Sequence, residues 1–301
     1  MPDLVQGFAM RALFRLDSLH PFLQPRWICE ADDDSYQVST AIRPAGDLGN
    51  SQRVKRVDLD SYLAANLPEY IKTELVLDVG AFHPRIWRGD HNPDPREFFA
   101  PEWAMSWGGI ATLVRRMQEI FRHVEPCSDN LRAYGHEIRQ LLILAATETE
   151  SSLRAVLRAN GYEQKGQWST RDYVKLLKPM HLAEWELSLQ GYPLLPPVAP
   201  FNSWDVDAPT QTLPWYEAYN DVKHDRERAF PKATLAHAIT ATAAAFAVFV
   251  AQFGEPDERR GDGLGDFHVT KRSTFTLREQ YVPPYLAGTA ALSWTPVLLA
   301  W

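Results

Sequence analysis

The sequence predicts a mainly α-helical fold: a helical bundle over residues 101–254, with a small β-containing layer formed by the N- and C-terminal segments. Two observations favour the bundle. Apolar residues recur at the helical period between about 101 and 160, and residues 233–254 form a run of 22 without Asp, Glu, Lys or Arg. The stretches that are typical of strands lie outside the bundle, in the flanking segments.

The composition is that of a globular protein, and it excludes several classes. The chain is 45% hydrophobic and 23% charged, and its 301 residues can bury a sizeable core. A net charge of −7 excludes a broad basic nucleic-acid surface but allows a local basic pocket. Two cysteines are too few for a disulfide framework or a thiolate zinc site. Since the first residues lack a signal-peptide pattern, we expect a cytoplasmic protein.

The N-terminal segment, residues 1–100, is expected to mix helices and strands. The pattern predicts a helix at 8–19, two strands within 26–44 around an acidic turn, a helix at 58–66 and a strand at 75–83. Polar residues at 45–56 and four prolines at 84–102 predict loops.

The middle segment, residues 101–254, is expected to hold the bundle. Its predicted helices span 101–124, 130–160, 169–177, 215–230 and 233–254. The proline-rich stretch 190–214 predicts a long loop. Residues 255–301 follow as a strand-containing tail. We expect this tail to pack on the N-terminal segment, because its apolar end would otherwise be exposed.

The last predicted helix is long enough to span a bilayer, so its composition has to decide between membrane and core. Ala and Thr dominate the run, Leu and Ile are scarce, and His237 and Gln252 lie inside it. Ala-rich faces let helices approach closely, which favours a buried core helix and no membrane span. Pro231 suits a first helical position and Gly254 a C-terminal cap.

The most informative stretch is the predicted helix at 215–230, WYEAYNDVKHDRERAF. On one continuous helix Asn220 and His224 are four residues apart, and Lys223 and Glu227 lie on the same face. A different stripe begins with apolar or aromatic residues that suit packing: Trp215, Tyr219 and Val222. One side of the helix therefore packs, while the other presents an amide, an imidazole, an ammonium and a carboxylate together.

This helix, the segment TETESSLRAVL at 147–157 and the Ala-rich last helix together resemble the HEPN family. The resemblance covers about residues 101–254. It implies a helical bundle that pairs as a homodimer and belongs to a bacterial toxin–antitoxin, phage-defence or RNA-processing system. It also implies RNA or a nucleotide as ligand, and a protein partner such as an antitoxin. Many HEPN domains are metal-independent endoribonucleases, which implies no cofactor and no metal.

The HEPN motif consists of an arginine, a polar residue, three variable residues and a histidine. His224 matches the histidine and Asn220 the polar residue, which would make them the catalytic pair. The arginine position falls on Tyr219, which cannot supply a fixed positive charge to a phosphate. The resemblance therefore assigns substrate binding to four residues: Lys223, Arg226, Tyr219 and Glu150. Of these, Lys223 and Arg226 would take the place of the arginine.

Three functions remain open from the sequence. The first is a nuclease or former nuclease that acts on RNA, with the His224 imidazole moving the proton of the 2′-hydroxyl. The second is a non-catalytic regulatory module, which the tyrosine at the arginine position favours. The third is a structural interaction protein whose His224 is hydrogen-bonded inside the bundle. The spacing of His83 and His91 fits no metal pattern, so no metal site is expected there.

Overall fold

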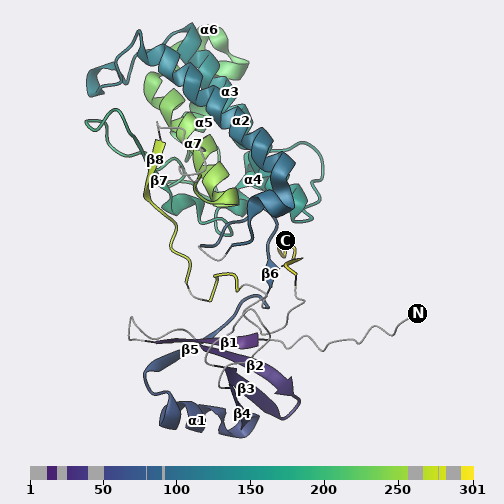
Figure 1. The fold of residues 1–301 in the computed structure, drawn as a ribbon. Coiled ribbons are helices and arrows are strands. Elements are labelled where there is room, and N and C mark those ends of the chain that lie inside the picture. The colour runs from purple at the N-terminus through teal and green to yellow at the C-terminus, as the bar shows by residue number, and fades with distance from the viewer. Residues whose placement is uncertain are drawn as a thin grey trace. The chain divides into compact units, whose positions relative to one another are not determined.

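The computed structural model describes residues 12–18, 26–39, 51–78, 80–89, 92–256, 267–276, 278–282 and 293–301 (Figure 1). The chain divides into two compact units, and neither is continuous in sequence. Unit 1 is drawn from Met1–His83, Arg88–Pro93 and Phe275–Val297, and unit 2 from Pro84–Trp87, Asp94–Thr274 and Leu298–Trp301. The described residues are mainly α-helical with small sheets, as predicted.

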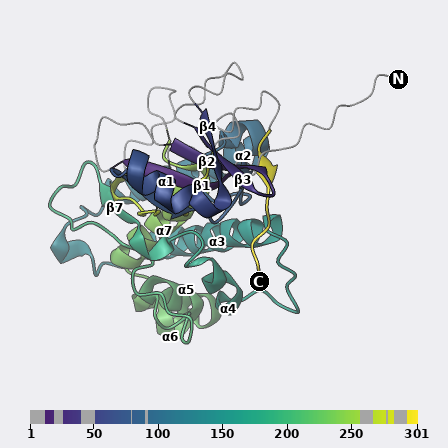
Figure 2. The ribbon, with the colours of Figure 1, turned by 90° about the horizontal axis from the view of Figure 1, so that it is seen from below.

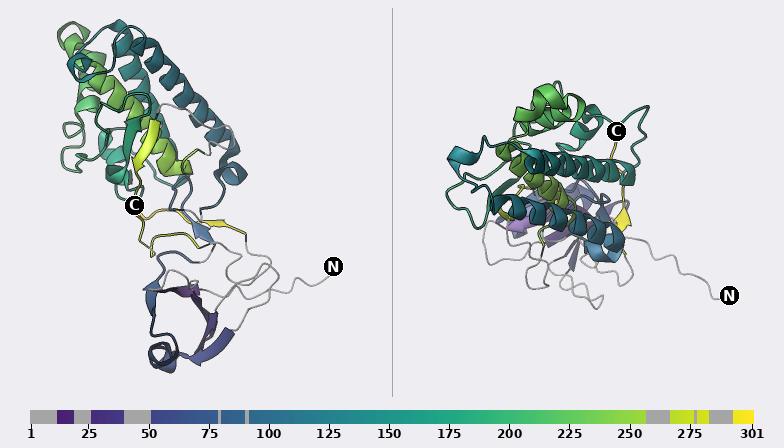
Figure 3. Two further views of the ribbon diagram at one scale, coloured as in Figure 1. Left: turned by 60° about the vertical axis from the view of Figure 1, so that its left-hand side comes forward. Right: turned by 90° about the horizontal axis from the view of Figure 1, so that it is seen from above.

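Unit 1 is built on a five-stranded antiparallel sheet in the order β4-β3-β2-β1-β5 (Figure 3). Its strands are β1 Ala12–Ser18, β2 Arg26–Asp32, β3 Ser35–Ser39, β4 Ser51–Lys55 and β5 Tyr70–Glu74. Helix α1, Leu59–Asn66, contacts β4. The core consists of buried side chains from the sheet and from α1 and its end: Leu16, Ile28, Val38, Val54, Leu59 and Leu67.

The hairpin β2–β3 around Asp33–Asp34 and the helix α1 confirm two predictions. The predicted helix at 8–19 is wrong over its described part, since residues 12–18 form the strand β1. The reason is pairing, because β1 hydrogen-bonds to β2 on one side and β5 on the other. Residues 8–11 and 19 lie outside the described residues.

Two further predictions for unit 1 are wrong. The expected loop at 45–56 contains the strand β4, which pairs with β3 from Ser51 to Lys55. The expected strand at 75–83 is reduced to β6, Ala81–Phe82, which pairs in parallel with β9, Thr295–Pro296. Strand pairing with distant residues decides both cases, and the local pattern does not contain it.

Unit 2 is a helical bundle around one central helix (Figures 1 and 2). Its helices are α2 Pro95–Phe121, α3 His136–Ala159, α4 Thr170–Tyr173, α5 Pro214–His224, α6 Arg226–Ala229 and α7 Leu235–Phe253. Helix α7 contacts α2, α3 and α5. Strands β7, Glu186–Leu189, and β8, Phe267–Lys271, form a small antiparallel ribbon beside the bundle.

Helix α7 is, among the described residues, the one helix long and apolar enough to cross a membrane. However, 83% of its most apolar 18-residue window is buried inside the protein, which fits the core helix of a soluble protein. The Thr234 hydroxyl accepts from the His237 N–H at 3.3 Å, so Thr234 caps the helix. The prediction for Pro231 is therefore wrong: it lies in the preceding 3₁₀ turn, Phe230–Lys232. Gly254 ends the helix at φ 80°, as predicted.

Two further helix starts in unit 2 differ from the prediction. Helix α2 begins at Pro95, because Asp94 accepts from the Arg96 N–H at 2.9 Å and proline suits the first turn, but it is broken at Phe99, which has φ −138° and ψ 36°. The loop predicted at 84–102 is therefore too long, while the helix predicted from 101 corresponds to the part of α2 after the break. Helix α3 begins at His136 rather than at 130, after the 3₁₀ turn Ser128–Asn130.

The C-terminal tail is divided between the units. Strand β8 pairs with β7 of unit 2, not with the N-terminal segment, whereas β9 pairs with β6 of unit 1. The last residue docks on unit 2, where the Trp301 Nε1 donates to the Asn160 carbonyl at 2.8 Å. As predicted, no helix or strand spans the described proline-rich stretch from 190 to 213.

Candidate functional site

The predicted helix at 215–230 is broken in the middle. Helix α5 ends at His224, and Asp225 leaves the helical conformation with φ −133° and ψ 78°. The Asp225 carboxylate accepts from the Arg228 N–H at 3.2 Å and so starts α6. The prediction of one continuous helix is wrong, and Glu227 is not on one helical face with Asn220 and His224.

The break creates a shallow hollow at the end of α5. It has a volume of about 320 Å³. Residues of α5, α6 and the turns that follow each helix line it: Asn220, Asp221, His224, Asp225, Arg228, Ala229 and Lys232. The structure therefore brings the two predicted catalytic residues, His224 and Asn220, into one concave site.

The charges in this hollow are partly neutralised. Lys232 Nζ lies 2.5 Å from Asp221 Oδ2, and the Asp225 carboxylate is engaged by the Arg228 N–H. Among the described residues, the side chains of Asn220, His224 and Arg228 make no hydrogen bond or ion pair. An amide, an imidazole and a guanidinium are therefore available to a ligand in the same hollow.

Three of the other predicted site residues, Tyr219, Lys223 and Glu150, belong to a network between α5 and α3 on a different face of α5, called the packed face. Tyr219 is only 1% exposed, and its hydroxyl accepts from Lys223 Nζ at 2.8 Å. The Tyr216 hydroxyl donates to Glu150 Oε1 of α3 at 2.5 Å. The rings of Tyr216 and Tyr219 meet edge to face at 5.4 Å. This network ties α5 to α3, and none of its members lines the hollow.

The environment of the packed face shifts the pKa of three groups upward. Burial and the bond to Glu150 raise the pKa of Tyr216. Burial, with Glu150 nearby, raises the pKa of Tyr173 in α4 to about 12. The hydrogen bond to Tyr219 raises the pKa of Lys223. At neutral pH Tyr216 and Tyr173 are therefore neutral and Lys223 is charged, which suits a structural network.

Sequence reasoning missed Arg228, while the predicted Arg226 is exposed and does not line the hollow. On a continuous helix Arg228 would follow His224 by four residues, among several other charged neighbours. The sequence signal that could have identified Arg228 is Asp225, which directly follows His224. Aspartate is a residue type that favours helix starts. Reading Asp225 as a second start would have predicted the break between α5 and α6.

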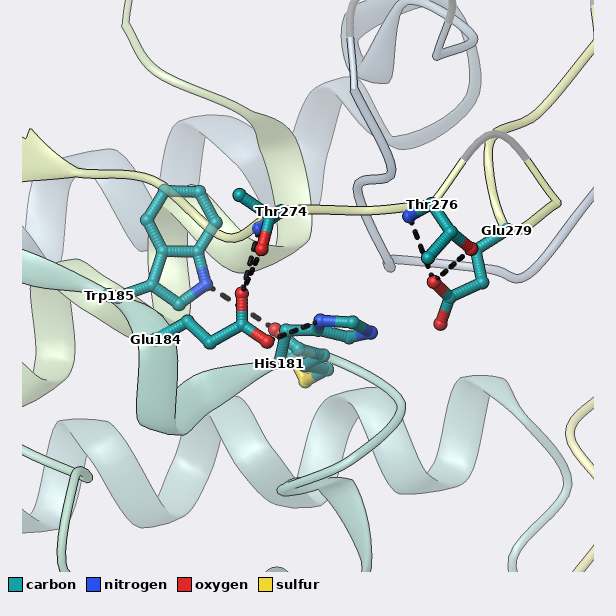
Figure 4. A network of polar contacts seen from close by, with 7 residues as sticks. His181, Glu184, Trp185, Thr274, Thr276 and Glu279 are labelled. Carbon is teal, nitrogen blue, oxygen red and sulfur yellow. Dashed lines mark hydrogen bonds and ion pairs between the residues drawn. The ribbon is translucent and has the colours of Figure 1, made fainter.

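A second polar network lies in unit 2 around Glu184, before β7 (Figure 4). Its carboxylate accepts from the Thr274 N–H at 2.8 Å and the Thr274 hydroxyl at 3.0 Å, and lies 2.9 Å from His181 Nδ1. Burial opposes ionisation of Glu184, but the bonds from Thr274 and His181 outweigh it and lower its pKa. All the acceptor oxygens of Glu184 are occupied, so this network fastens the segment after β8 rather than offering a site.

Histidines elsewhere do not form a metal site in the described residues. His83 is 7% exposed, and its Nδ1 lies 2.7 Å from the Val297 carbonyl. Burial lowers its pKa. His91 lies outside the described residues. No group of three His, Cys, Asp or Glu side chains in the described part of the chain could hold a metal ion.

Comparisons with known proteins add no further constraint. No family model matches the sequence, and no curated protein or solved structure matches it. The HEPN resemblance therefore stays a prediction that rests on the residues quoted above.

Proposed function

We propose that this chain is a HEPN-like, cytoplasmic RNA-binding protein whose ligand occupies the hollow at the end of α5. One observation carries the proposal: Asn220, His224 and Arg228 line one hollow, and their side chains have no partner among the described residues. Unpaired donors at a concave surface suit a phosphodiester, whose oxygens accept hydrogen bonds and attract positive charge.

The same three groups support a metal-independent cleavage mechanism. The 2′-oxygen attacks phosphorus and the bond from phosphorus to the 5′-oxygen breaks. The His224 imidazole takes the proton of the 2′-hydroxyl while water protonates the leaving 5′-oxygen, or the imidazolium protonates that oxygen while water takes the first proton. The Asn220 amide orients the phosphate. Arg228 supplies the positive charge that stabilises the transition state. In the HEPN motif an arginine has this role, at the position where this chain has Tyr219. Because His224 is exposed and the hollow is shallow, water screens these charges, and we expect a weak activity.

A homodimer would remedy this exposure. HEPN-like pairing through the bundle brings two hollows together and covers each with the other copy. We therefore propose a homodimer as the RNA-binding form, with a protein partner such as an antitoxin as a second means of covering the hollow.

A non-catalytic regulatory module is the second candidate function. It is favoured by Tyr219, which stands at the motif's arginine position, is buried and is bonded to Lys223. In that case the hollow binds RNA but does not cleave it. The third candidate, a histidine held inside the bundle for structure, is disfavoured because His224 is exposed.

The test uses single-stranded RNA carrying a fluorescent label, with the intact protein and its His224→Ala variant, in EDTA. We expect binding by both proteins and slow cleavage by the wild type alone. Cleavage by neither protein, with binding retained, selects the regulatory module. An absence of both binding and cleavage in the wild type would refute the proposed function.

A further inference from the structure

Unit 2 has a second cavity, which is larger than the hollow at α5. It has a volume of about 550 Å³ and lies between the end of α2 and the start of α3. Its lining is drawn from these two helix ends and the residues beside them: Arg116, Glu119, Ile120, Arg122, His123, Val124, Tyr134, Gly135, His136, Glu137, Ile138 and Leu141. This volume is in the range of small-molecule sites. The cavity shares no lining residue with the hollow.

The exposed lining residues of this cavity, called its rim, include two available cations. Arg116 and Arg122 are exposed, and their guanidinium groups make no hydrogen bond or ion pair among the described residues. The carboxylates of Glu119 and Glu137 also line the cavity but are not paired with them. Two unpaired guanidinium groups beside a cavity suit a phosphate or carboxylate, which each of them can bind in bidentate fashion.

The interior of the cavity is apolar and aromatic. Its buried apolar lining residues, called its floor, are Ile120, Ile138 and Leu141, which are between 1% and 8% exposed. On one wall, Tyr134 and His136 pack against the Phe230 ring, with centroid distances of 5.6 Å and 4.9 Å. Held by Phe230, these two rings offer a fixed surface to a flat or apolar group.

We propose that this cavity binds an amphiphilic organic anion: an aromatic or aliphatic body on the floor, and a phosphate or carboxylate group at the arginine rim. The separation of charge at the rim from apolar surface inside distinguishes this ligand from inorganic phosphate and from a neutral hydrocarbon. It also distinguishes the cavity from the hollow, which has no large apolar side chain in its lining.

Calorimetric titration of the full chain tests the proposal with 1-naphthyl phosphate, 1-naphthol and inorganic phosphate. We expect 1-naphthyl phosphate to bind more tightly than either of the other two probes. Replacing both cations, Arg116→Gln with Arg122→Gln, should weaken its binding by about tenfold or more and leave 1-naphthol unaffected. Arg115→Gln is the matched control, since Arg115 is an exposed neighbour of Arg116 that does not line the cavity.

Four results would overturn the proposal. The first three are no measurable binding of 1-naphthyl phosphate at millimolar concentration, equal affinity for inorganic phosphate, and unchanged affinity in the double variant. A loss of binding in Arg228→Gln with none in the double variant would likewise refute it, because the anion would then occupy the hollow. The double variant should keep the wild-type circular dichroism, since both arginines are exposed.

Discussion

Two faces of α5 carry similar polar groups in opposite environments. On one face Tyr216, Tyr219 and Lys223 are paired with each other or with Glu150. On the other, Asn220 and His224 line the hollow without a partner among the described residues. The hydrogen bonds of the first face stabilise the fold, whereas the polar groups of the second face remain available to a ligand. Polar residues gathered on a helix therefore indicate function only where burial and pairing leave them available.

The largest expected effect is on the packed face, at the position of the motif's arginine. Tyr219→Arg would place a second cation beside Lys223 at a site that is 1% exposed. We expect it to lower the free energy of unfolding by roughly 3–5 kcal/mol, because the charge is buried and the carboxylate of this network, Glu150, already accepts from Tyr216. Urea unfolding followed by tryptophan fluorescence measures this. A stable Tyr219→Arg protein that cleaves RNA faster than wild type would contradict the structural role given to this face.

The next effect concerns the bond between α5 and α3. Tyr216→Phe keeps the ring but removes the donor to Glu150, and we expect a loss of about 1–3 kcal/mol in the free energy of unfolding. Tyr134→Phe is the control, since Tyr134 is 53% exposed and its hydroxyl makes no bond among the described residues. Equal unfolding curves for both variants would show that the bond to Glu150 contributes nothing.

Glu148 of α3 differs from the polar groups on both faces of α5, because its side chain is half-buried and yet unpaired among the described residues. Its side chain lies against Gly109 of α2, and burial raises its pKa. The folded chain therefore holds this proton more tightly than the unfolded chain, and stability falls as pH rises from the ordinary carboxyl range through the raised pKa. Glu148→Gln should be more stable than wild type at pH 7 and equal to it below pH 4. A variant that is less stable at pH 7 would indicate a partner for the carboxylate.

The smallest stability effect is expected on the face that lines the hollow. His224 is exposed and unpaired in the described structure, so His224→Ala should change the free energy of unfolding by less than about 0.5 kcal/mol. The same urea titration measures it. A loss comparable to that of Tyr216→Phe would place His224 among the structural residues and remove the contrast between the two faces.

Sequence reasoning succeeded where one segment decides its own structure. The periodic apolar residues of α3 and the uncharged run of α7 predicted two buried helices. It failed where distant partners or a single cap decide. β1 is a strand because two other strands flank it, and α5 ends at His224 because Asp225 starts a new helix. Arg228 lines the hollow as a result of that break, so its place could not follow from helical spacing alone.

The claim that the hollow binds RNA is tested most directly by the two arginines of α6. Both are exposed, but only Arg228 lines the hollow with His224. In fluorescence anisotropy with labelled single-stranded RNA, Arg228→Gln should weaken binding by about tenfold, the loss of one charge-assisted contact, and Arg226→Gln should leave it nearly unchanged. Equal losses in the two variants, or none in either, would contradict the assignment of this hollow as the RNA site.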